Sequence, residues 1–381
     1  MAESASHYIG LMSGTSLDGA DGVLVAFDDD PCGSLSVLAS ATQAFTPDFK
    51  QELLALNTPG HNEIHRAALA AARLTQVYAD VVQRLRAQVA PCLSITAIGV
   101  HGQTVRHQPG GTAGLQHSAY TVQLNCPALL AELTGLDVVS DFRSRDIAAG
   151  GQGAPLVPAF HQQAFGQPDA GVMVLNIGGI ANVTVLPPQH DIGVSVIGFD
   201  CGPGNALMDA WCQQHTGLPF DDNGDWAASG KLVPALLQSL LDTPYLTQPP
   251  PKSTGRDLFS LNWLAGKLAP YAGQAPADIQ NTLTEFTARA CIDSLTPHLS
   301  ACSALIVCGG GAFNTYLMHR LQAGLPSLQV ESSAAHGLPA LQVEAAAFAW
   351  LARQTVRRLP GNLASVTGAA GARILGAIYP A

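Results

Sequence analysis

The sequence predicts an α/β protein of two domains, each built on a mixed β-sheet flanked by helices. Three observations lead to this prediction. At 381 residues, the chain is longer than one hydrophobic core usually supports. An apolar strand, a glycine turn and a second apolar strand occur twice, at 8–27 and 172–186, about 160 residues apart, as in a duplicated architecture. Several apolar runs also end at glycine turns that lead directly into helical patterns.

We expect the domain boundary near Val139, just before a charged stretch that leads into a glycine loop. The first domain is predicted to comprise residues 1–139 with 366–381, and the second residues 140–365. A cleft between two domains is a natural place for a ligand, so we expect the active site there.

The composition excludes several classes of protein. Hydrophobic residues make up 47% of the chain and charged residues 12%, which indicates a compact globular protein rather than a disordered one. The net charge is −10, and lysine and arginine form no extended run. Nucleic acid and anionic membrane surfaces are therefore not expected as partners.

The sequence also indicates a cellular compartment. Residues 1–7 lack a basic region, and every apolar run is interrupted well before the ~18 residues that a membrane span needs. We therefore expect a soluble cytoplasmic protein. The cysteines show no Cys-x-x-Cys pair, so reduced thiols are expected rather than disulfides or zinc; they are Cys32, Cys92, Cys126, Cys201, Cys212, Cys291, Cys302 and Cys308.

The turn of the first predicted hairpin is rich in glycine, serine and threonine. Residues 8–12 and 20–27 are apolar, and the segment between them reads Ser-Gly-Thr-Ser-Leu-Asp-Gly. Successive backbone N–H groups in a tight turn form a concavity that binds anions such as phosphate. Many such hairpins are only turns, so this segment alone leaves both interpretations open.

Asp200 is the first candidate for a catalytic base. The apolar run from Val196 is expected to end at this carboxylate, and a glycine-proline turn and a helical pattern follow it. Ligands of open α/β sheets bind at the carboxyl ends of strands, so an acid in that position points toward a ligand. The alternative is that Asp200 only caps the turn or the helix.

Three consecutive glycines, Gly309 to Gly311, follow a third apolar run at 304–308 and precede a helix. Without side chains, such a segment lets a flat group such as adenine lie directly on the backbone. Neither the Gly-x-Gly-x-x-Gly fingerprint in a Rossmann context nor a P-loop motif is present.

Other polar residues have two interpretations each. Residues 63–90 predict a long helix packed on a sheet, and the buried strand at 95–100 leads to His101, which is either a ligand contact or a structural histidine. Arg143 and Arg145 either clamp an anion or pair with neighbouring aspartates.

Two further regions are equally open. Lys252 and Arg256 either approach a phosphate or lie in solvent. Glu344 lies in the first turn of the helix predicted at 341–359, where the helix dipole alone would favour a carboxylate.

Taken together, the two glycine hairpins and the triple glycine resemble the phosphate and adenosine elements of the superfamily of actin, heat-shock ATPases and sugar kinases. The match to the anhydro-N-acetylmuramic acid kinase family is closer still and spans nearly the whole chain. It is carried by Met12 to Asp21, His101 to Thr104, Gly150 to Pro155, Phe199 to Asn205, Lys252 to Arg256 and Gly309 to Asn314. The resemblance implies a two-domain actin-like ATPase fold of the ribonuclease H-like type.

The resemblance also implies an activity. Such an enzyme opens the 1,6-anhydro ring of anhydro-N-acetylmuramic acid with water and phosphorylates O6 from ATP, in peptidoglycan recycling. By the family's motif Asp200 is the catalytic base and binds the substrate, together with Glu344 and His101. The nucleotide-binding residues that we infer are Gly14, Thr15, Ser16, Leu17, Asp18, Gly19, Ala20, Asp21, Asn205, Lys252, Gly309, Gly310 and Gly311.

The expected cofactors are ATP and Mg²⁺. Many members of the superfamily place an aspartate in each hairpin for the metal, whereas this chain has Met12 and Asn176 there. The metal ligands therefore stay unassigned. The oligomeric state also stays open, with a homodimer as one option.

Two competing classes of function remain to be distinguished. A chaperone-like or assembly ATPase on the same fold would hydrolyse ATP without a sugar. An inverting glycosidase that uses paired carboxylates would act without ATP, and it would leave the hairpins and the triple glycine unexplained.

Overall fold

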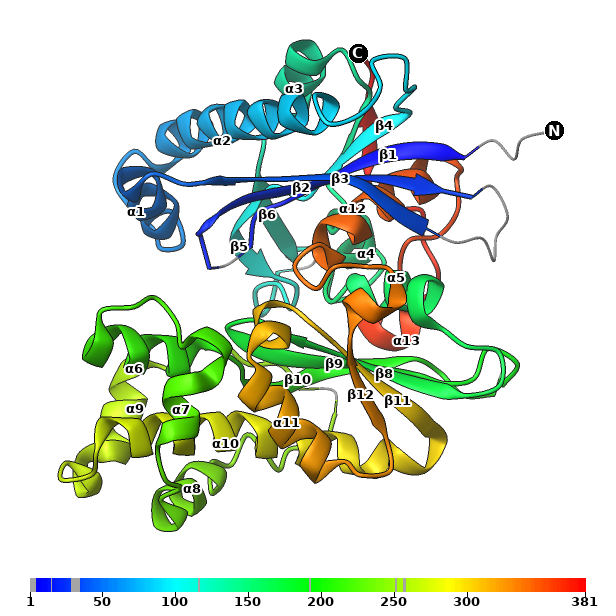
Figure 1. Ribbon diagram of the computed structural model, residues 1–381. Coiled ribbons are helices and arrows are strands. Elements are labelled where there is room, and N and C mark those ends of the chain that lie inside the picture. The colour runs from blue at the N-terminus through cyan, green and yellow to red at the C-terminus, as the bar shows by residue number, and fades with distance from the viewer. Residues whose placement is uncertain are drawn as a thin grey trace. The chain divides into compact units, whose positions relative to one another are not determined.

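The computed structural model describes residues 5–14, 16–28, 35–115, 117–191, 193–250, 252–255 and 258–381 (Figure 1). The chain forms two compact units. Unit 1 comprises Met1–Ala164 with Gln342–Ala381, and unit 2 comprises Phe165–Leu341. Each unit is described by itself.

Unit 1 is built on a six-stranded mixed sheet in the order β13-β7-β4-β1-β2-β3. Strands β1, β2 and β3 form an antiparallel meander, β4 and β7 continue the sheet parallel to β1, and β13 closes the edge antiparallel to β7. Their bounds are β1 Ser6–Met12, β2 Gly19–Phe27, β3 Leu35–Ala44, β4 Ala97–Val100, β7 Val138–Ser140 and β13 Ala377–Tyr379.

Two long helices cover the opposite faces of this sheet (Figure 1). A Cβ atom added to Gly22 of β2 would meet Val81 and Leu85 of α2, Glu63–Arg86. A Cβ atom added to Gly10 of β1 would lie 1.8 Å from a carbonyl oxygen of α12, Val343–Val356. Because the register pairs Leu11 with Gly22, Gly10 points to the face opposite Gly22. Glycine in β1 thus allows α12 to lie close against the strand.

The remaining elements of unit 1 are short. Strands β5 and β6 form a separate antiparallel pair, and α3 packs against α2. These elements are α1 Pro47–Ala55, β5 Gln103–Gln108, β6 Tyr120–Leu124, α3 Pro127–Thr134, α4 Ser144–Ala148, α5 Val157–Phe165, which ends where unit 2 begins, and α13 Ala364–Thr367.

Unit 2 repeats the strand topology of unit 1. Its five-stranded sheet has the order β10-β9-β8-β11-β12, in which β8, β9 and β10 form an antiparallel meander and β11 and β12 run parallel to β8. The bounds are β8 Gly171–Ile177, β9 Ile180–Leu186, β10 Ile197–Pro203, β11 Cys302–Cys308 and β12 Gln329–Ser332. The order β3-β2-β1-β4-β7 in unit 1 is the same arrangement. The predicted duplication and the ribonuclease H-like fold are therefore confirmed.

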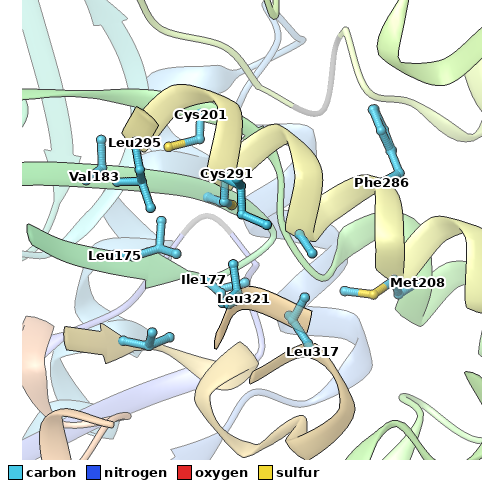
Figure 2. Close-up of a cluster of buried hydrophobic side chains, with 14 of the residues drawn as sticks. Leu175, Ile177, Val183, Cys201, Met208, Phe286, Cys291, Leu295, Leu317 and Leu321 are labelled. Carbon is cyan, nitrogen blue, oxygen red and sulfur yellow. The ribbon is translucent and has the colours of Figure 1, made fainter. Parts of the chain in front are cut away.

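The core of unit 2 lies between its sheet and α10, Pro276–Leu295. Figure 2 shows Leu175 and Val183 of the sheet gathered with Cys291 and Leu295 of this helix, all of them buried. The other helices are α6 Ala206–Thr216, α7 Asp225–Ser229, α8 Pro234–Leu241, α9 Leu261–Leu268 and α11 Thr315–Gly324, with 3-10 turns η1 Asp222–Gly224, η2 Ala269–Tyr271, η3 Thr296–Ala301, η4 Gly310–Phe313 and η5 Ser333–His336. Among the helices of the described residues, none combines the length and apolar character needed to cross a bilayer.

The limits of the units differ from the predicted boundaries at 139/140 and 365/366. Residues 140–164 and 342–365 belong to unit 1. Helix α12 packs on β1, β2 and β4, which places this late segment in the first unit. The buried Asp146 carboxylate also accepts hydrogen bonds from Asn362 Nδ2 at 2.6 Å and Thr367 Oγ1 at 2.7 Å. Both contacts are long-range in sequence, so local composition could not indicate them.

Candidate active site

Asp200 lies in the middle of β10, the edge strand of the unit 2 sheet. The expectation that it ends the strand is wrong. A β-bulge at Cys201 shifts the register, so that Gly202 and Pro203 still pair with Ala181 and Ile180 of β9. A proline is tolerated there because the strand's outer edge has no neighbouring strand in the sheet. The bulge places Asp200 at an irregular point of the strand.

A segment at 252–254 holds Asp200 in place. The backbone N–H of Thr254 donates to Asp200 Oδ2 at 2.9 Å, and Ser253 Oγ donates to the same oxygen at 3.1 Å. The N–H of Asp200 donates to the Lys252 carbonyl at 3.2 Å. Because the carboxylate binds this segment, it does not cap helix α6, whose N-cap residue is Asn205. The capping interpretation of Asp200 therefore does not apply.

Burial raises the pKa of Asp200 above its usual 3.8, and this effect outweighs the hydrogen bonds from Thr254 and Ser253 and the charge of Lys252. Carboxylates in partly desolvated surroundings are stronger bases than free ones. Asp200 is thus suited chemically to accept a proton.

The predicted nucleotide elements of unit 2 lie together. Gly309, at the end of β11, has a φ of +78°, and a Cβ atom there would lie 2.5 Å from Asn176 Oδ1. The backbone N–H of Asn205 donates to the carbonyl of Gly178 at 2.7 Å, and its Nδ2 donates to the carbonyl of Ile177 at 3.1 Å. The β8–β9 turn, the start of α6 and the triple glycine are therefore neighbours.

The sequence suggested that the triple glycine leads directly into a helix, but it does not. Gly310 and Gly311 belong to the 3-10 turn η4, and α11 begins only at Thr315. A Cβ atom on Gly311 would lie 2.5 Å from the side chain of Ile177, so this glycine is required by packing against β8. A Cβ atom added to Gly310 would lie 3.2 Å from Asn205 Nδ2.

The Lys252 side chain does not lie free in solvent, and it folds back onto its own unit. Its Nζ donates to the carbonyl of Leu246 at 2.9 Å and lies 5.0 Å from the centre of the Tyr245 ring. Burial lowers the pKa of this amine. The side chain thus anchors its own segment to unit 2, and Arg256 lies outside the described residues.

In unit 1 the turn between β1 and β2 contains the first set of predicted nucleotide residues. Leu17 and Ala20 are buried in the core, so their side chains are not available to a ligand. Ser13, just before Gly14, is held by Tyr78 Oη at 2.8 Å and donates to the Gly102 carbonyl at 3.2 Å. Thr15 lies outside the described residues.

The polar residues of this turn face different partners. Asp18 and Lys50 form an exposed ion pair at 2.7 Å. Asp21 lies in β2, opposite Met12 of β1, and accepts a hydrogen bond from Thr42 Oγ1 at 2.7 Å, while burial raises its pKa. Ser16 is half-buried, and Gly14 and Gly19 lie at the two ends of the turn.

His101 is buried next to Arg143 in unit 1. Arg143 Nε donates to His101 Nε2 at 3.0 Å, and Arg143 Nη1 donates to the carbonyl of Gly153 at 2.7 Å. Burial first, and the Arg143 charge second, hold the pKa of His101 well below 6.5. The ring is therefore neutral, and it also contacts Phe348 with 4.7 Å between ring centres. Arg143 forms these bonds in place of an ion pair with an adjacent aspartate.

Glu344 lies in the first turn of α12, half-buried. Burial raises its pKa, Arg143 lowers it and Asp21 raises it further. Within the parts of the chain that are described, no hydrogen bond to its carboxylate is found. The helix dipole explains why a carboxylate is tolerated here but gives it no partner. A desolvated carboxylate without a partner is typical of a ligand-binding group.

Sequence reasoning missed the residues that hold other site residues in position by hydrogen bonds. Ser253, Thr254 and Tyr245 surround Asp200, and Tyr78 holds Ser13, yet each is an ordinary residue in its own segment. A signal for Ser253 and Thr254 was available, because they lie within the segment from Lys252 to Arg256 that carries part of the resemblance. The seven described cysteines are free thiols, and the described residues contain no group of three or more potential metal ligands.

Comparison with known proteins shows the family to which this chain belongs. The sequence model of the family described as anhydro-N-acetylmuramic acid kinase matches residues 6–381. A protein of that name from Variovorax paradoxus is 60% identical over 376 residues, covering 98% of this chain and 99% of the relative. Others are from Cupriavidus pinatubonensis, 54% identical with full coverage of both chains, and Nitrosomonas europaea, 51% identical over 98% of this chain and all of the relative. The chain belongs to the anhydro-N-acetylmuramic acid kinase family.

Proposed function

We propose that this protein is an ATP-dependent kinase acting on 1,6-anhydro-N-acetylmuramic acid in peptidoglycan recycling and amino-sugar catabolism in the cytoplasm. It opens the anhydro ring with water and phosphorylates O6, giving N-acetylmuramic acid 6-phosphate and ADP. Family membership over residues 6–381 supports the activity. The observation that carries the chemistry is Asp200, a partly buried carboxylate with one oxygen held by two donors.

The reaction needs one base for two bond changes. Asp200 accepts a proton from water while the water oxygen forms a bond to C1 of the sugar. The C1–O6 bond breaks, and its electron pair remains on O6. O6 then attacks the γ-phosphorus of ATP, and the bond to the β–γ bridging oxygen breaks to release ADP. General-base assistance contributes roughly 10²- to 10⁴-fold, and positioning of the reactants contributes much of the rest.

We assign ATP to the glycine-rich backbone of both units. In unit 2, Gly309 to Gly311 and Asn205 lie beside the β8–β9 turn, and the glycines place no side chain between the backbone and a nucleotide. In unit 1, the connection between β1 and β2 has the same place in the strand order as the β8–β9 turn has in unit 2. Lys252 contributes by anchoring its own segment to unit 2 and not by contacting a phosphate directly.

Mg²⁺ is proposed to enter with ATP, where it neutralises charge that develops on the phosphates. A Mg²⁺ ion in a kinase keeps several waters and needs only one or two protein carboxylates besides the phosphates. Asp21, a carboxylate near the start of β2, would supply one such ligand. We assign no geometry to the ion.

We propose Glu344, His101 and Asp200 as the residues that bind the sugar. Glu344 is an acceptor for sugar hydroxyl or amide N–H groups, because its carboxylate has no partner within the described residues. His101 is neutral, and the Arg143 bond to Nε2 leaves the proton on Nδ1. A neutral ring does not deliver a proton to the leaving group at neutral pH. Its second nitrogen, Nδ1, is buried and has no hydrogen-bond partner among the described residues.

Purified protein incubated with Mg-ATP, with and without anhydro-N-acetylmuramic acid, tests this function. We expect ADP to form only when the sugar is present, together with one equivalent of sugar phosphate. Equal ADP release without sugar would support the chaperone-like ATPase class instead. Ring opening at full rate without ATP would support the glycosidase class.

A further inference from the structure

The outer edge of β10 is covered by a short segment, Lys252–Gly255. Edge strands expose unpaired backbone N–H and C=O groups, and β10 is at the edge of its sheet. The N–H of Asp200 points away from β9 and donates to the Lys252 carbonyl at 3.2 Å. One backbone hydrogen bond therefore ties this segment to the strand at the position of the proposed base.

Counting only the described residues, every polar atom of Asp200 except one has a partner in this region. The backbone N–H binds Lys252, and the carbonyl accepts a hydrogen bond from Tyr245 Oη at 2.9 Å. Oδ2 accepts from the Thr254 N–H at 2.9 Å and from Ser253 Oγ at 3.1 Å. Among the residues that the structure describes, none donates a hydrogen bond to Oδ1.

We propose that Ser253 is a positioning residue, which together with the Thr254 amide holds Asp200 Oδ2 and leaves Oδ1 as the atom that accepts the proton. This inference rests on the proposed function, in which Asp200 is the base. Two donors on one oxygen fix the rotation of the carboxylate about its Cβ–Cγ bond. A fixed carboxylate presents its free oxygen in one direction, which a general base requires.

The segment itself is anchored, so it can fix another group. Lys252 Nζ donates to the Leu246 carbonyl at 2.9 Å and lies over the ring of Tyr245. Tyr245 is buried, and its hydroxyl binds the backbone of Asp200. The backbone of Asp200 and the segment that holds its carboxylate are thus tied to the same tyrosine.

The charge balance around Asp200 supports the role of Ser253. The titratable groups that face it are Lys252 and Tyr245 beside the strand and Cys201 on it, while its partner on β9 is Asn182. Burial raises the pKa of Asp200, and the Thr254 and Ser253 hydrogen bonds act against that rise. The Ser253 hydrogen bond therefore favours the ionised form of the base as well as orienting it. Because Ser253 is exposed, its replacement leaves the fold intact.

Ser253→Ala tests the proposal, with Ser253→Thr as the conservative variant and Thr247→Val as the matched control. Thr247 lies in the same region, and its hydroxyl binds only the Pro244 carbonyl among the described residues. The ionisation of Asp200 is measured by ¹³C NMR of protein labelled at the aspartate carboxyl carbons, with Asp200→Asn to assign the signal. The kcat/KM for sugar phosphorylation is measured over the same pH range.

In Ser253→Ala we expect the NMR midpoint and the acidic limb of kcat/KM to move up together by about 0.5 to 1 pH unit. Ser253→Thr should restore both values, and Thr247→Val should leave both unchanged. An unchanged midpoint in Ser253→Ala would overturn the positioning role, whatever the activity of the protein. If the midpoint moves but Asp200→Asn retains normal turnover, Ser253 does position the carboxylate and the proposed function is what fails.

Discussion

Arg143 Nε donates a hydrogen bond to His101 Nε2, 3.0 Å away. This bond requires a lone pair on Nε2, so it fixes the neutral form of the ring with its proton on Nδ1. Desolvation and the Arg143 charge both disfavour a second proton, and together they hold the pKa of His101 well below 6.5. The histidine is therefore a fixed hydrogen-bonding group rather than an acid.

The first prediction concerns this ring. We expect His101 to show no titration between pH 5.5 and 8 in ¹⁵N NMR spectra, with the shift pattern of a neutral Nδ1–H imidazole. Arg143→Ala removes a positive charge, so it should raise the pKa of His101, although burial will keep it below the usual value. A wild-type ring that titrates near pH 6.5 would contradict this electrostatic description.

The second prediction concerns the proposed base. Asp200→Asn keeps an oxygen that can accept the hydrogen bonds from Ser253 and Thr254, but the amide cannot accept a proton from water. We expect kcat to fall by roughly 10²- to 10⁴-fold, with an unchanged circular dichroism spectrum and melting curve. Turnover close to that of the wild type would remove Asp200 from the mechanism.

The third prediction separates affinity from stability at Glu344. Removing its carboxylate in Glu344→Gln should raise the KM for the sugar by roughly tenfold or more, because a charged hydrogen-bond acceptor is lost. The KM for ATP serves as the internal control. If the sugar KM is unchanged, Glu344 is only a charge at a helix terminus.

The same variant should bind the sugar more weakly, but its folded state should be no less stable than that of the wild type. Burial raises the folded-state pKa of Glu344 above its unfolded value of 4.5, so the ionised form destabilises the folded protein above the raised pKa. Glu344→Gln should therefore have a Tm at pH 7 equal to that of the wild type or about 1–3 °C higher. The difference should disappear as the pH falls below 4.5, and a lower Tm at pH 7 would contradict the assigned burial.

The fourth prediction concerns the packing that holds α12. In Gly10→Ala the new Cβ atom would lie 1.8 Å from the Ala345 carbonyl oxygen, so the helix must move away from β1. We expect the free energy of unfolding to fall by about 3 kcal/mol or more. The matched control is Gly110→Ala, where no atom lies within 4 Å of the built Cβ and the glycine has no positive φ. Equal stability of the two variants in denaturant titrations would refute the packing.

Much of the fold could be predicted because its signals are local. The hairpins β1–β2 and β8–β9 follow from apolar runs around glycine turns, and their recurrence indicated the duplication. The unit limits could not be predicted, because they depend on α12 packing against β1 and on the contacts of Asp146 with Asn362 and Thr367. Contacts between residues about 200 positions apart leave no local pattern.

The candidate site was predictable to a similar extent. Asp200, Glu344 and His101 were found as polar residues at strand or helix ends and through the family resemblance. The bulge that continues β10 past Asp200 was missed, because a glycine-proline pair normally ends a strand. The bonds from Ser253 and Arg143 were missed for a different reason. Their residue types are common, and only the folded chain brings them to their partners.

The central claim is that ring opening by water and phosphorylation of O6 occur in one reaction with Asp200 as base. The most direct test is to run the reaction with Mg-ATP and anhydro-N-acetylmuramic acid in ¹⁸O-labelled water and to analyse the products by mass spectrometry. We predict one heavy oxygen on the sugar, at C1, and none in the phosphoryl group. Heavy oxygen in the phosphoryl group, or product formed without ATP, would contradict the claim.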